Sequence, residues 1–244
     1  MIFGGLQKVS LLEYPGNICA VLFTQGCNFR CPFCHNPNLV DPARFGPTIP
    51  EDSILRFLEN RRGKLDAVTI SGGEPTLQSD LLSFTRLVKS MGYKIKLDTN
   101  GSLPEVVESL SQEQLIDYWA MDIKAPLNLY STVCGMHVKE ADIQRSMQLI
   151  RSSQKNWEFR TTYYNEVMNW NDILEIQTLL QPGDKYYIQQ CVYDNTLVPH
   201  PDINHSRLDM LLHKNLSPAP TPAQTQIQTL KDNSRLQQII VKMR

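Results

Sequence analysis

The chain has 244 residues, of which 41% are hydrophobic and 20% charged, and its formal net charge at pH 7 is −1. This composition is ordinary for a globular protein with a buried core, and the small net charge excludes a general electrostatic attraction to nucleic acid or to an anionic membrane. The apolar run ICAVLF (18–23) is too short to cross a bilayer, and the N-terminal residues lack a secretory-signal pattern. We therefore expect a cytoplasmic protein, where clustered cysteines serve metal or redox chemistry rather than disulfides.

Short apolar segments alternate along the chain with segments of helical period. Most of the apolar segments are hydrophobic on both sides, which is typical of parallel strands covered on both faces. The expected strands are 18–24, 66–71, 93–99, 118–123, 157–163 and 185–191.

Capping signals and apolar stripes predict the helices between these strands. Thr48 and Glu51 have capping-box spacing, and Ser102 and Glu105 repeat it with Pro104 in the first turn. Four apolar stripes at helical period predict contacts with the core rather than function. These stripes are Ile54, Leu55 and Leu58; Leu81, Phe84, Val88 and Met91; Ile143, Met147 and Ile150; and Ile173, Ile176 and Leu180.

Six strand–helix units in succession predict an α/β fold with a parallel sheet and right-handed crossovers. At this length, a partial (β/α)6 barrel fits better than a complete eight-unit barrel, and a flat doubly wound sheet is also compatible. The Pro-rich segment 217–226 predicts a linker, and LQQIIVKMR (236–244) a terminal strand. We therefore expect a core domain over residues 1–195 and a short C-terminal appendage over 196–244.

The string TQGCNFRCPFCHNP (24–37) follows the first expected strand and holds Cys27, Cys31 and Cys34, with His35 next. Four kinds of chemistry are compatible with it. CPFC suits a thioredoxin-like dithiol, and CPFCH formally matches covalent haem attachment. The Cys3His set suits a closed zinc site. Three cysteines spaced C-x3-C-x2-C can also hold three corners of a 4Fe-4S cluster and leave the fourth iron open.

The position of the string favours the open cluster. Pro37 and Pro42 make the next segment poor helix material, which argues against a thioredoxin-like site. Haem attachment of this type is expected outside the cytoplasm. A structural zinc site explains the ligands but not their place at the end of a strand, where α/β barrels form active sites. We rank the open cluster first, zinc second and the dithiol third.

Four polar motifs lie in or at the ends of later expected strands: SGGEP (71–75), DTNG (98–101), DIK (122–124) and RTT (160–162). Taken singly, each is typical of a turn, a helix cap or a solvated charge. Because parallel strands end at one edge of a sheet, the four motifs together indicate a site there.

With these motifs the chain resembles the radical S-adenosylmethionine (SAM) superfamily. Within it, the chain is similar to activating enzymes for glycyl-radical enzymes, most of all the activators of anaerobic ribonucleoside-triphosphate reductase. The C-x3-C-x2-C string followed by SGGEP is highly specific for the superfamily. KVSLLEYPG (8–16) is moderately specific for the reductase-activator branch, and Glu13 stands where Asp is more usual. The resemblance spans about residues 2–192.

The resemblance implies a radical SAM barrel, a 4Fe-4S cluster and SAM as cofactors. It implies that Cys27, Cys31 and Cys34 ligate three irons and that the open iron holds the methionine end of SAM. Reductive cleavage of SAM would give a radical that takes hydrogen from a glycine Cα of a partner glycyl-radical enzyme. The implied electron donor is a small protein such as flavodoxin.

The same resemblance implies SAM contacts for further residues. The implied contacts are Phe33 near the adenine; Gly72, Gly73 and Glu74 at the amino group; Asp122 and Lys124 at the amino, carboxylate or ribose ends; and Arg160 at the sulfonium or carboxylate. Asp98 and Thr99 resemble a monovalent-cation site. Activators often carry a histidine near the sixth strand for the ribose, but YYIQQCVYD (186–194) has none, which leaves Gln189 or Gln190.

Two other functions stay open from the sequence. One is a small-molecule radical SAM enzyme similar to 7-carboxy-7-deazaguanine synthase, and the other is a zinc-stabilised interaction module. Cys19, Cys134 and Cys191 are not needed by the cluster scheme, and we interpret Cys19 as a small buried hydrophobic residue.

Overall fold

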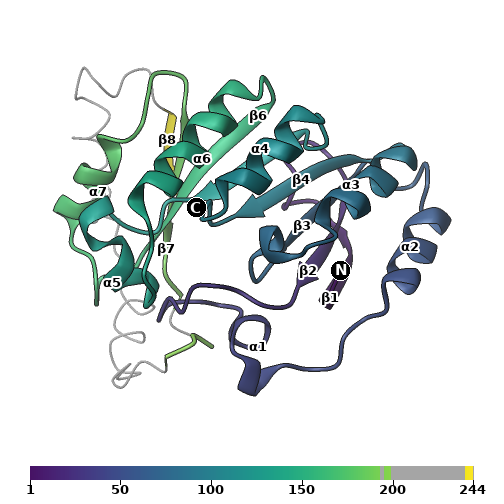
Figure 1. The fold of residues 1–244 in the computed structure, drawn as a ribbon, viewed down its shortest axis with the longest axis horizontal. Helices are drawn as coiled ribbons and strands as arrows, with labels where there is room; N and C mark the ends of the chain where they lie inside the picture. Colours follow the sequence, from purple (N-terminus) through teal and green to yellow (C-terminus); the bar gives the residue numbers. More distant parts are fainter. Residues whose placement is uncertain (193–194, 199–239, 244) are drawn as a thin grey trace, which may run out of the picture.

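The computed structural model describes residues 1–192, 195–198 and 240–243, which form one sheet with helices on its outer face (Figure 1). The sheet has eight strands in the order β1-β2-β3-β4-β5-β6-β7-β8. β1 is antiparallel to β2, and every later neighbour is parallel. The strands are β1 (Phe3–Ser10), β2 (Cys19–Thr24), β3 (Ala67–Gly72), β4 (Lys94–Thr99), β5 (Tyr118–Asp122), β6 (Asn156–Tyr163), β7 (Lys185–Gln190) and β8 (Ile240–Met243). The expected parallel α/β fold, a partial barrel that does not close, is confirmed.

Helices connect the parallel strands. They are α1 (Pro37–Val40), η1 (Pro42–Arg44), α2 (Glu51–Asn60), η2 (Pro75–Leu77), α3 (Leu81–Ser90), α4 (Pro104–Gln112), η3 (Leu127–Leu129), α5 (Tyr130–Cys134), α6 (Glu140–Ser152) and α7 (Trp170–Gln177). Among the described residues, no helix is both long and apolar enough to cross a membrane.

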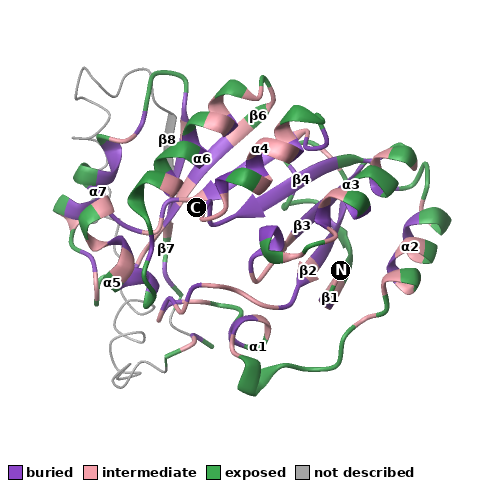
Figure 2. Cartoon of the chain, viewed as in Figure 1, coloured by how far each residue is buried: buried purple, intermediate pink, exposed green. Residues whose placement is uncertain are grey.

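The outer face of the sheet forms the main hydrophobic core with the helices. Successive side chains of a strand point to opposite faces, and one set of alternate residues, such as Leu22, Ile70, Leu97 and Trp119, packs against the helices. The predicted apolar stripes supply the helical side of this core. Figure 2 shows α3, α4 and α6 buried toward the sheet and exposed away from it.

The inner face has a different composition. Its second, much smaller apolar cluster contains Tyr14, Cys19, Val21, Ala67 and Tyr118, so the prediction of Cys19 as a small buried hydrophobic residue is confirmed. The remaining inner positions include polar and charged side chains that are nonetheless buried: Thr69, Lys96, Asp98 and Glu158. Buried charges need partners, and Lys96 pairs here with Asp98.

Three details differ from the sequence expectations. β1 was not predicted, because this edge strand buries few of its residues and carries two glycines, so it shows no apolar run. Both predicted capping boxes are wrong: α2 and α4 begin after Pro50 and Leu103, with no side-chain cap, although Pro104 does occupy the first turn.

The segment after the cysteines also differs from its expectation. Pro37 and Pro42 each begin a short helical turn, where a missing N–H costs no hydrogen bond. The predicted terminal strand is confirmed as β8, which pairs with β7 and brings part of the expected appendage into the sheet. The predicted linker 217–226 lies outside the described residues, and the division at residue 195 stays a prediction.

Candidate active site

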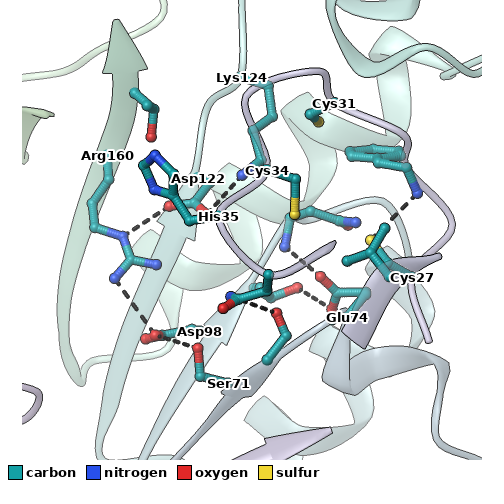
Figure 3. Close-up of a pocket in the computed structure, with 18 of the residues that line it drawn as sticks. Cys27, Cys31, Cys34, His35, Ser71, Glu74, Asp98, Asp122, Lys124 and Arg160 are labelled. Atoms are coloured by element: carbon teal, nitrogen blue, oxygen red, sulfur yellow. Dashed lines mark hydrogen bonds and ion pairs between the residues drawn. The ribbon is translucent and has the colours of Figure 1, made fainter. Parts of the chain in front are cut away.

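A cavity of about 360 Å³ opens at the edge where the parallel strands end. Its lining includes Cys27, Cys31, Cys34, Phe33, Gly72, Gly73, Glu74, Asp98, Thr99, Asp122, Lys124 and Arg160. Figure 3 shows the three cysteines on one side of the cavity and the charged residues of β4, β5 and β6 on the other. The structure therefore brings together these twelve residues, for each of which the sequence predicted a role in cluster, SAM or cation binding.

The cysteine loop is held by its own backbone and by one arginine. The Arg30 guanidinium donates from Nη1 to the carbonyl oxygens of Cys27 (2.7 Å) and Phe29 (2.8 Å). The Cys34 amide donates to the Cys31 carbonyl at 3.1 Å, and the Arg30 amide donates to the Cys134 carbonyl at 2.7 Å. These bonds fix the loop between the cysteines, so the positions of the three thiols are largely set by the fold.

Burial and the nearby positive charge have opposite effects on the pKa values of the loop thiols. Burial raises the pKa of the Cys27 thiol to about 12 and also raises that of Cys34. A hydrogen bond with the Cys134 thiol lowers the pKa of Cys31 and raises that of Cys134. The Lys124 ammonium favours the thiolate form of all three loop cysteines. Three soft donors with a cation beside them fit a cluster of iron and sulfide.

The two glycines of SGGEP are required by contact between backbones. A Cβ on Gly72, whose φ is 110°, would lie 2.5 Å from the Thr24 amide nitrogen. A Cβ on Gly73 would lie 2.0 Å from the Gly26 carbonyl oxygen. The Gly73 amide donates to the Thr24 carbonyl (2.9 Å) and the Glu74 amide to that of Gly26 (2.8 Å). The glycines thus let the β3 turn close against the start of the cysteine loop.

Glu74 is a buried connector. Its Oε1 accepts from the Thr76 amide (3.0 Å), the Thr76 hydroxyl (2.6 Å) and the Thr99 hydroxyl (2.8 Å), and its Oε2 accepts from the Asn100 amide (2.6 Å). Burial raises the pKa of this carboxyl, and these hydrogen bonds oppose the rise. In this structure Glu74 ties the β3 turn to the end of β4, and its contact with the SAM amino group stays a prediction.

A chain of polar side chains then connects the β4 end to the cysteine loop. The Asn100 Nδ2 donates to Asn28 Oδ1 at 2.9 Å, and the Asn28 Nδ2 donates to the Ser102 hydroxyl at 2.8 Å. Asn28 lies between the first two cysteines. Neither asparagine was predicted as part of the site, although their positions inside CNFRC and DTNG were a usable signal.

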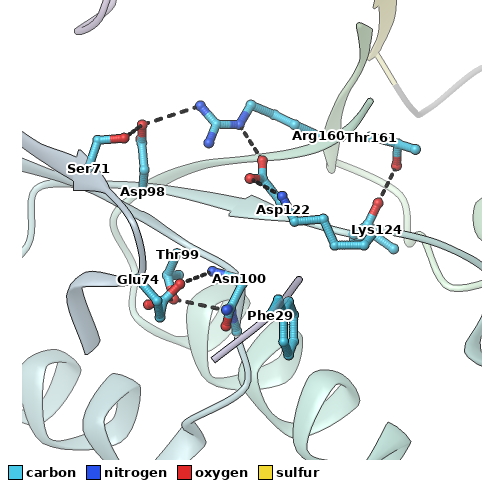
Figure 4. A network of polar contacts seen from close by, with 12 residues as sticks. Phe29, Ser71, Glu74, Asp98, Thr99, Asn100, Asp122, Lys124, Arg160 and Thr161 are labelled. Carbon is cyan, nitrogen blue, oxygen red and sulfur yellow. Dashed lines mark hydrogen bonds and ion pairs between the residues drawn. The ribbon is translucent and has the colours of Figure 1, made fainter. Parts of the chain in front are cut away.

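The charged side chains form a continuous network across β4, β5 and β6 (Figure 4). Lys124 Nζ lies 2.9 Å from Asp122 Oδ2, and Arg160 Nε donates to Asp122 Oδ1 at 2.8 Å. Arg160 Nη1 lies 3.6 Å from Asp98 Oδ2, and Lys96 pairs with the same carboxylate. The Ser71 hydroxyl donates to Asp98 at 2.9 Å.

These pairings keep the network charged. Burial raises the pKa of Asp122 and of Asp98, but the Arg160 and lysine charges lower both carboxyl pKa values to below their ordinary range. Burial lowers the pKa of Lys124 and Arg160, and the neighbouring carboxylates raise both above their ordinary values. Asp98 already faces two cations, and a monovalent ion at Asp98 and Thr99 stays a prediction. Lys96 was not predicted as part of the site.

The C-terminal part of the cysteine loop contacts residues that follow β6 and β7. Phe33 packs against Tyr164 with ring centroids 5.6 Å apart. His35 Nε2 lies 2.7 Å from the Val192 carbonyl oxygen and 3.7 Å from Cys191 Sγ. The Leu197 amide donates to the Cys34 carbonyl at 3.0 Å. Of the two glutamines proposed for the ribose, Gln189 lines the cavity.

The described residues contain no group of three or more His, Cys, Asp or Glu side chains arranged to hold a metal ion. His35 reaches toward Val192 rather than completing a Cys3His set. His35 therefore does not supply the fourth ligand of the closed zinc site that the sequence left open.

Comparisons with known proteins agree with the cluster motif. The sequence profile of the Radical SAM superfamily matches residues 21–180. A Methanocaldococcus jannaschii protein, named as a candidate glycyl-radical enzyme activating enzyme, is 36% identical over 195 residues, which cover 78% of this chain and 79% of that protein.

Two further relatives match about half of this chain. The pyruvate formate-lyase-activating enzyme of Listeria monocytogenes is 33% identical over 131 residues, or 49% of this chain and 51% of that enzyme. A 7-carboxy-7-deazaguanine synthase of Methanothermobacter thermautotrophicus is 33% identical over 124 residues, or 50% of this chain and 47% of that enzyme. The chain thus spans about half the length of these two relatives.

A solved structure, Streptococcus suis SuiB bound to S-adenosylmethionine, has the same fold. Its TM-score is 0.59 at 17% identity, and the match covers 92% of this chain and 51% of SuiB. The family profile and the M. jannaschii relative each cover most of the chain, and together they establish that this protein belongs to the radical SAM superfamily, whose cofactors are a 4Fe-4S cluster and S-adenosylmethionine, and within it to the glycyl-radical enzyme activating enzymes.

Proposed function

We propose that this protein generates a glycyl radical on an anaerobic ribonucleoside-triphosphate reductase, with a flavodoxin-like protein as its electron donor. The observation that carries the proposal is that the three cysteine thiols and the network of Asp122, Lys124 and Arg160 line one cavity. A cavity with soft donors on one wall and fixed charges of both signs on the other suits a cluster and a zwitterionic sulfonium substrate.

The residues that would hold the cluster are Cys27, Cys31 and Cys34. When bound, the cluster would supply the single electron for reductive cleavage of SAM, the chemistry on which glycyl-radical formation on the partner depends. The cysteine loop places three thiols in this cavity rather than four, which would suit a cluster with one iron open to the substrate. Arg30 and the asparagine chain hold the loop in place, which limits motion between the cluster and the substrate.

The charged network would orient SAM. Lys124 presents an ammonium that can pair with the methionine carboxylate, and Asp122 presents a carboxylate that can accept from the methionine amino group. Asp122 is held by both Lys124 and Arg160, and Lys124 is held by Asp122, so little rotamer entropy is lost when the substrate binds. The Tyr130 hydroxyl accepts from the Lys124 amide at 3.1 Å and donates to the Asp122 carbonyl, which holds this turn.

Further contacts with SAM follow from the lining of the cavity. Phe33 would lie near the adenine, Gln189 would donate to the ribose, and the main-chain carbonyl of Gly72 would accept from the amino group together with Glu74. The Gly73 and Glu74 amides are already bonded to the Thr24 and Gly26 carbonyls, so these two amides would not donate to the substrate.

Electron paramagnetic resonance tests the proposal. Anaerobically reconstituted, reduced protein should change its cluster signal when SAM is added. It should then produce a glycyl-radical signal on an anaerobic ribonucleoside-triphosphate reductase, and less or none on a pyruvate formate-lyase. A signal on the lyase alone would reassign the partner and keep the activase chemistry.

The similarity to 7-carboxy-7-deazaguanine synthase supports a second candidate, a radical SAM enzyme that acts on a small molecule. Formation of 5′-deoxyadenosine without any protein radical, together with turnover of the deazaguanine-synthase substrate, would establish it instead. Cys31→Ala serves as the control in both assays, because it should remove every SAM-dependent signal.

A further inference from the structure

A second cavity, of about 560 Å³, lies at the opposite edge of the sheet from the cysteines. Its lining includes Lys94, Tyr118, Asn156 and Lys185, which are the first residues of β4, β5, β6 and β7. Lys155 precedes β6 and also lines it. Three lysines therefore surround this cavity at the N-terminal ends of the parallel strands, whereas the cysteines lie at the C-terminal ends.

The charge of this cavity is not balanced by its own acids. In the described part of the chain, none of Lys94, Lys155 and Lys185 forms an ion pair. Lys94 Nζ donates to Asn17 Oδ1 at 3.0 Å, and Lys185 Nζ lies 6.0 Å from the Tyr118 ring centroid. Like charges near one another repel, and a bound anion removes that cost.

The single carboxylate in the lining, Asp117, already has partners outside the three lysines. Asp117 accepts from Lys89 Nζ at 2.8 and 3.0 Å and from the Ile95 amide at 2.8 Å. Asp117 therefore forms its ion pair with Lys89 of α3 and its backbone hydrogen bond with β4, and not with the three lysines of the cavity. The cavity keeps an excess of positive charge in a chain whose formal net charge is only −1.

Other side chains supply a wall and further donors. The rings of Tyr14 and Tyr118 lie 5.7 Å apart at the base of the inner face, and both residues are buried. Burial and the nearby Asp117 raise the pKa of Tyr14 to about 12, so its hydroxyl stays protonated and able to donate. The side-chain amides of Gln154 and Asn156 add donors on the β6 side.

We propose that this cavity binds a small anion that carries several phosphate groups. Lysine ammonium groups bind phosphate as point charges. Three lysines around one cavity therefore suit a ligand with several phosphate groups better than a ligand with a single carboxylate. A free inorganic polyphosphate and the polyphosphate of a nucleotide share this chemistry. No residue named here lines the cysteine cavity, so the proposal stands apart from the proposed function.

Isothermal titration calorimetry tests the proposal on anaerobic holoprotein saturated with SAM, so that the first cavity is filled. The probes are inorganic tripolyphosphate, ATP and adenosine. We expect saturable binding of tripolyphosphate that weakens as salt is raised, and no binding of adenosine alone. Equal affinity for ATP and tripolyphosphate assigns the binding to phosphate alone, whereas tighter binding of ATP adds a ring contact with the tyrosines.

Matched variants locate the binding. Lys155→Gln and Lys185→Gln should each weaken tripolyphosphate binding about tenfold, while Lys139→Gln, an exposed lysine at the start of α6, should leave it unchanged. Circular dichroism and ligand-free thermal unfolding check that each variant is folded. Absence of saturable binding overturns the proposal, and so does binding that neither cavity variant weakens.

Discussion

Neighbouring residues on β4 and β5 face opposite sides of the sheet and differ completely in chemistry. Leu97 and Met121 belong to the apolar core under the helices. Asp98 and Asp122, the next residue in each strand, belong to the charged network of the cavity. Each of these strands contributes to the apolar core through one face and to the site through the other. Substitutions at adjacent residues should therefore affect different properties, either the free energy of unfolding or the binding and cleavage of SAM.

The largest effect is expected at the cysteine edge. Cys31→Ala should abolish cluster binding and SAM cleavage, because two thiolates remain where three are needed. Iron and sulfide analysis after anaerobic reconstitution, together with the visible absorption of the protein, measures the loss.

Cys19→Ala is the matched control, since Cys19 is also buried and lies on β2 of the same chain but outside the loop. It should keep the cluster. Full activity of Cys31→Ala would refute the cluster assignment.

On the outer face, Leu97→Ala should lower the free energy of unfolding by about 2–5 kcal/mol, because it removes buried methyl groups and leaves a cavity. Chemical unfolding at pH 7 measures this change. The affinity of the folded variant for SAM should stay as in the wild type. A large loss of SAM affinity without a loss of stability would show that the two faces are not separable.

Lys124→Ala should keep the cluster and weaken SAM binding by about ten- to a hundredfold, because a charge-assisted contact with the methionine carboxylate is lost. Equilibrium binding of SAM to the reconstituted protein measures the change. Lys139→Ala, at an exposed lysine, is the control. Loss of iron from Lys124→Ala would instead assign this lysine a structural role in the cysteine loop.

The smallest effect is expected in the acid range. The pKa of Asp98 is held below its ordinary 3.8 in the folded protein, since the pull of Arg160 and Lys96 outweighs burial. Such a carboxylate stabilises the fold above its unfolded pKa, and this stability is lost as the pH falls through the folded pKa. Asp98→Asn should therefore show a shallower loss of stability below about pH 4. Unfolding midpoints between pH 3 and pH 7 measure it, and an unchanged slope would count against the pairing.

The sequence predicted the parts of this molecule that have a period or a motif. The parallel strands and the apolar stripes follow from local hydrophobic pattern, and the cysteine loop, SGGEP, DIK and RTT follow from the rule that parallel strands end at one edge. β1 was missed because an edge strand with glycines and exposed residues carries no such pattern.

Other features depend on contacts between distant segments, which spacing alone does not reveal. The Asn28–Asn100 bond joins residues 72 positions apart, and Cys134 reaches Cys31 from α5. The glycines of SGGEP were expected as contacts of the SAM amino group, and the sequence did not reveal that the backbone of Thr24 and Gly26 occupies their Cβ positions. Lys96 was missed because a lysine in a strand usually faces solvent, and here Asp98 and the inner face enclose it.

The pairing of β8 with β7 has a practical consequence for anyone who shortens this protein. Ile240–Met243 pair with residues 185–188 and satisfy hydrogen-bonding groups along that side of β7. A truncated version that stops after the cysteine-loop contacts at Val198 would leave that side of β7 unpaired, and a bare strand edge recruits other chains. Loss of the last few residues should therefore appear first as aggregation during purification, before any defect in the chemistry at the opposite end of the strands can be measured.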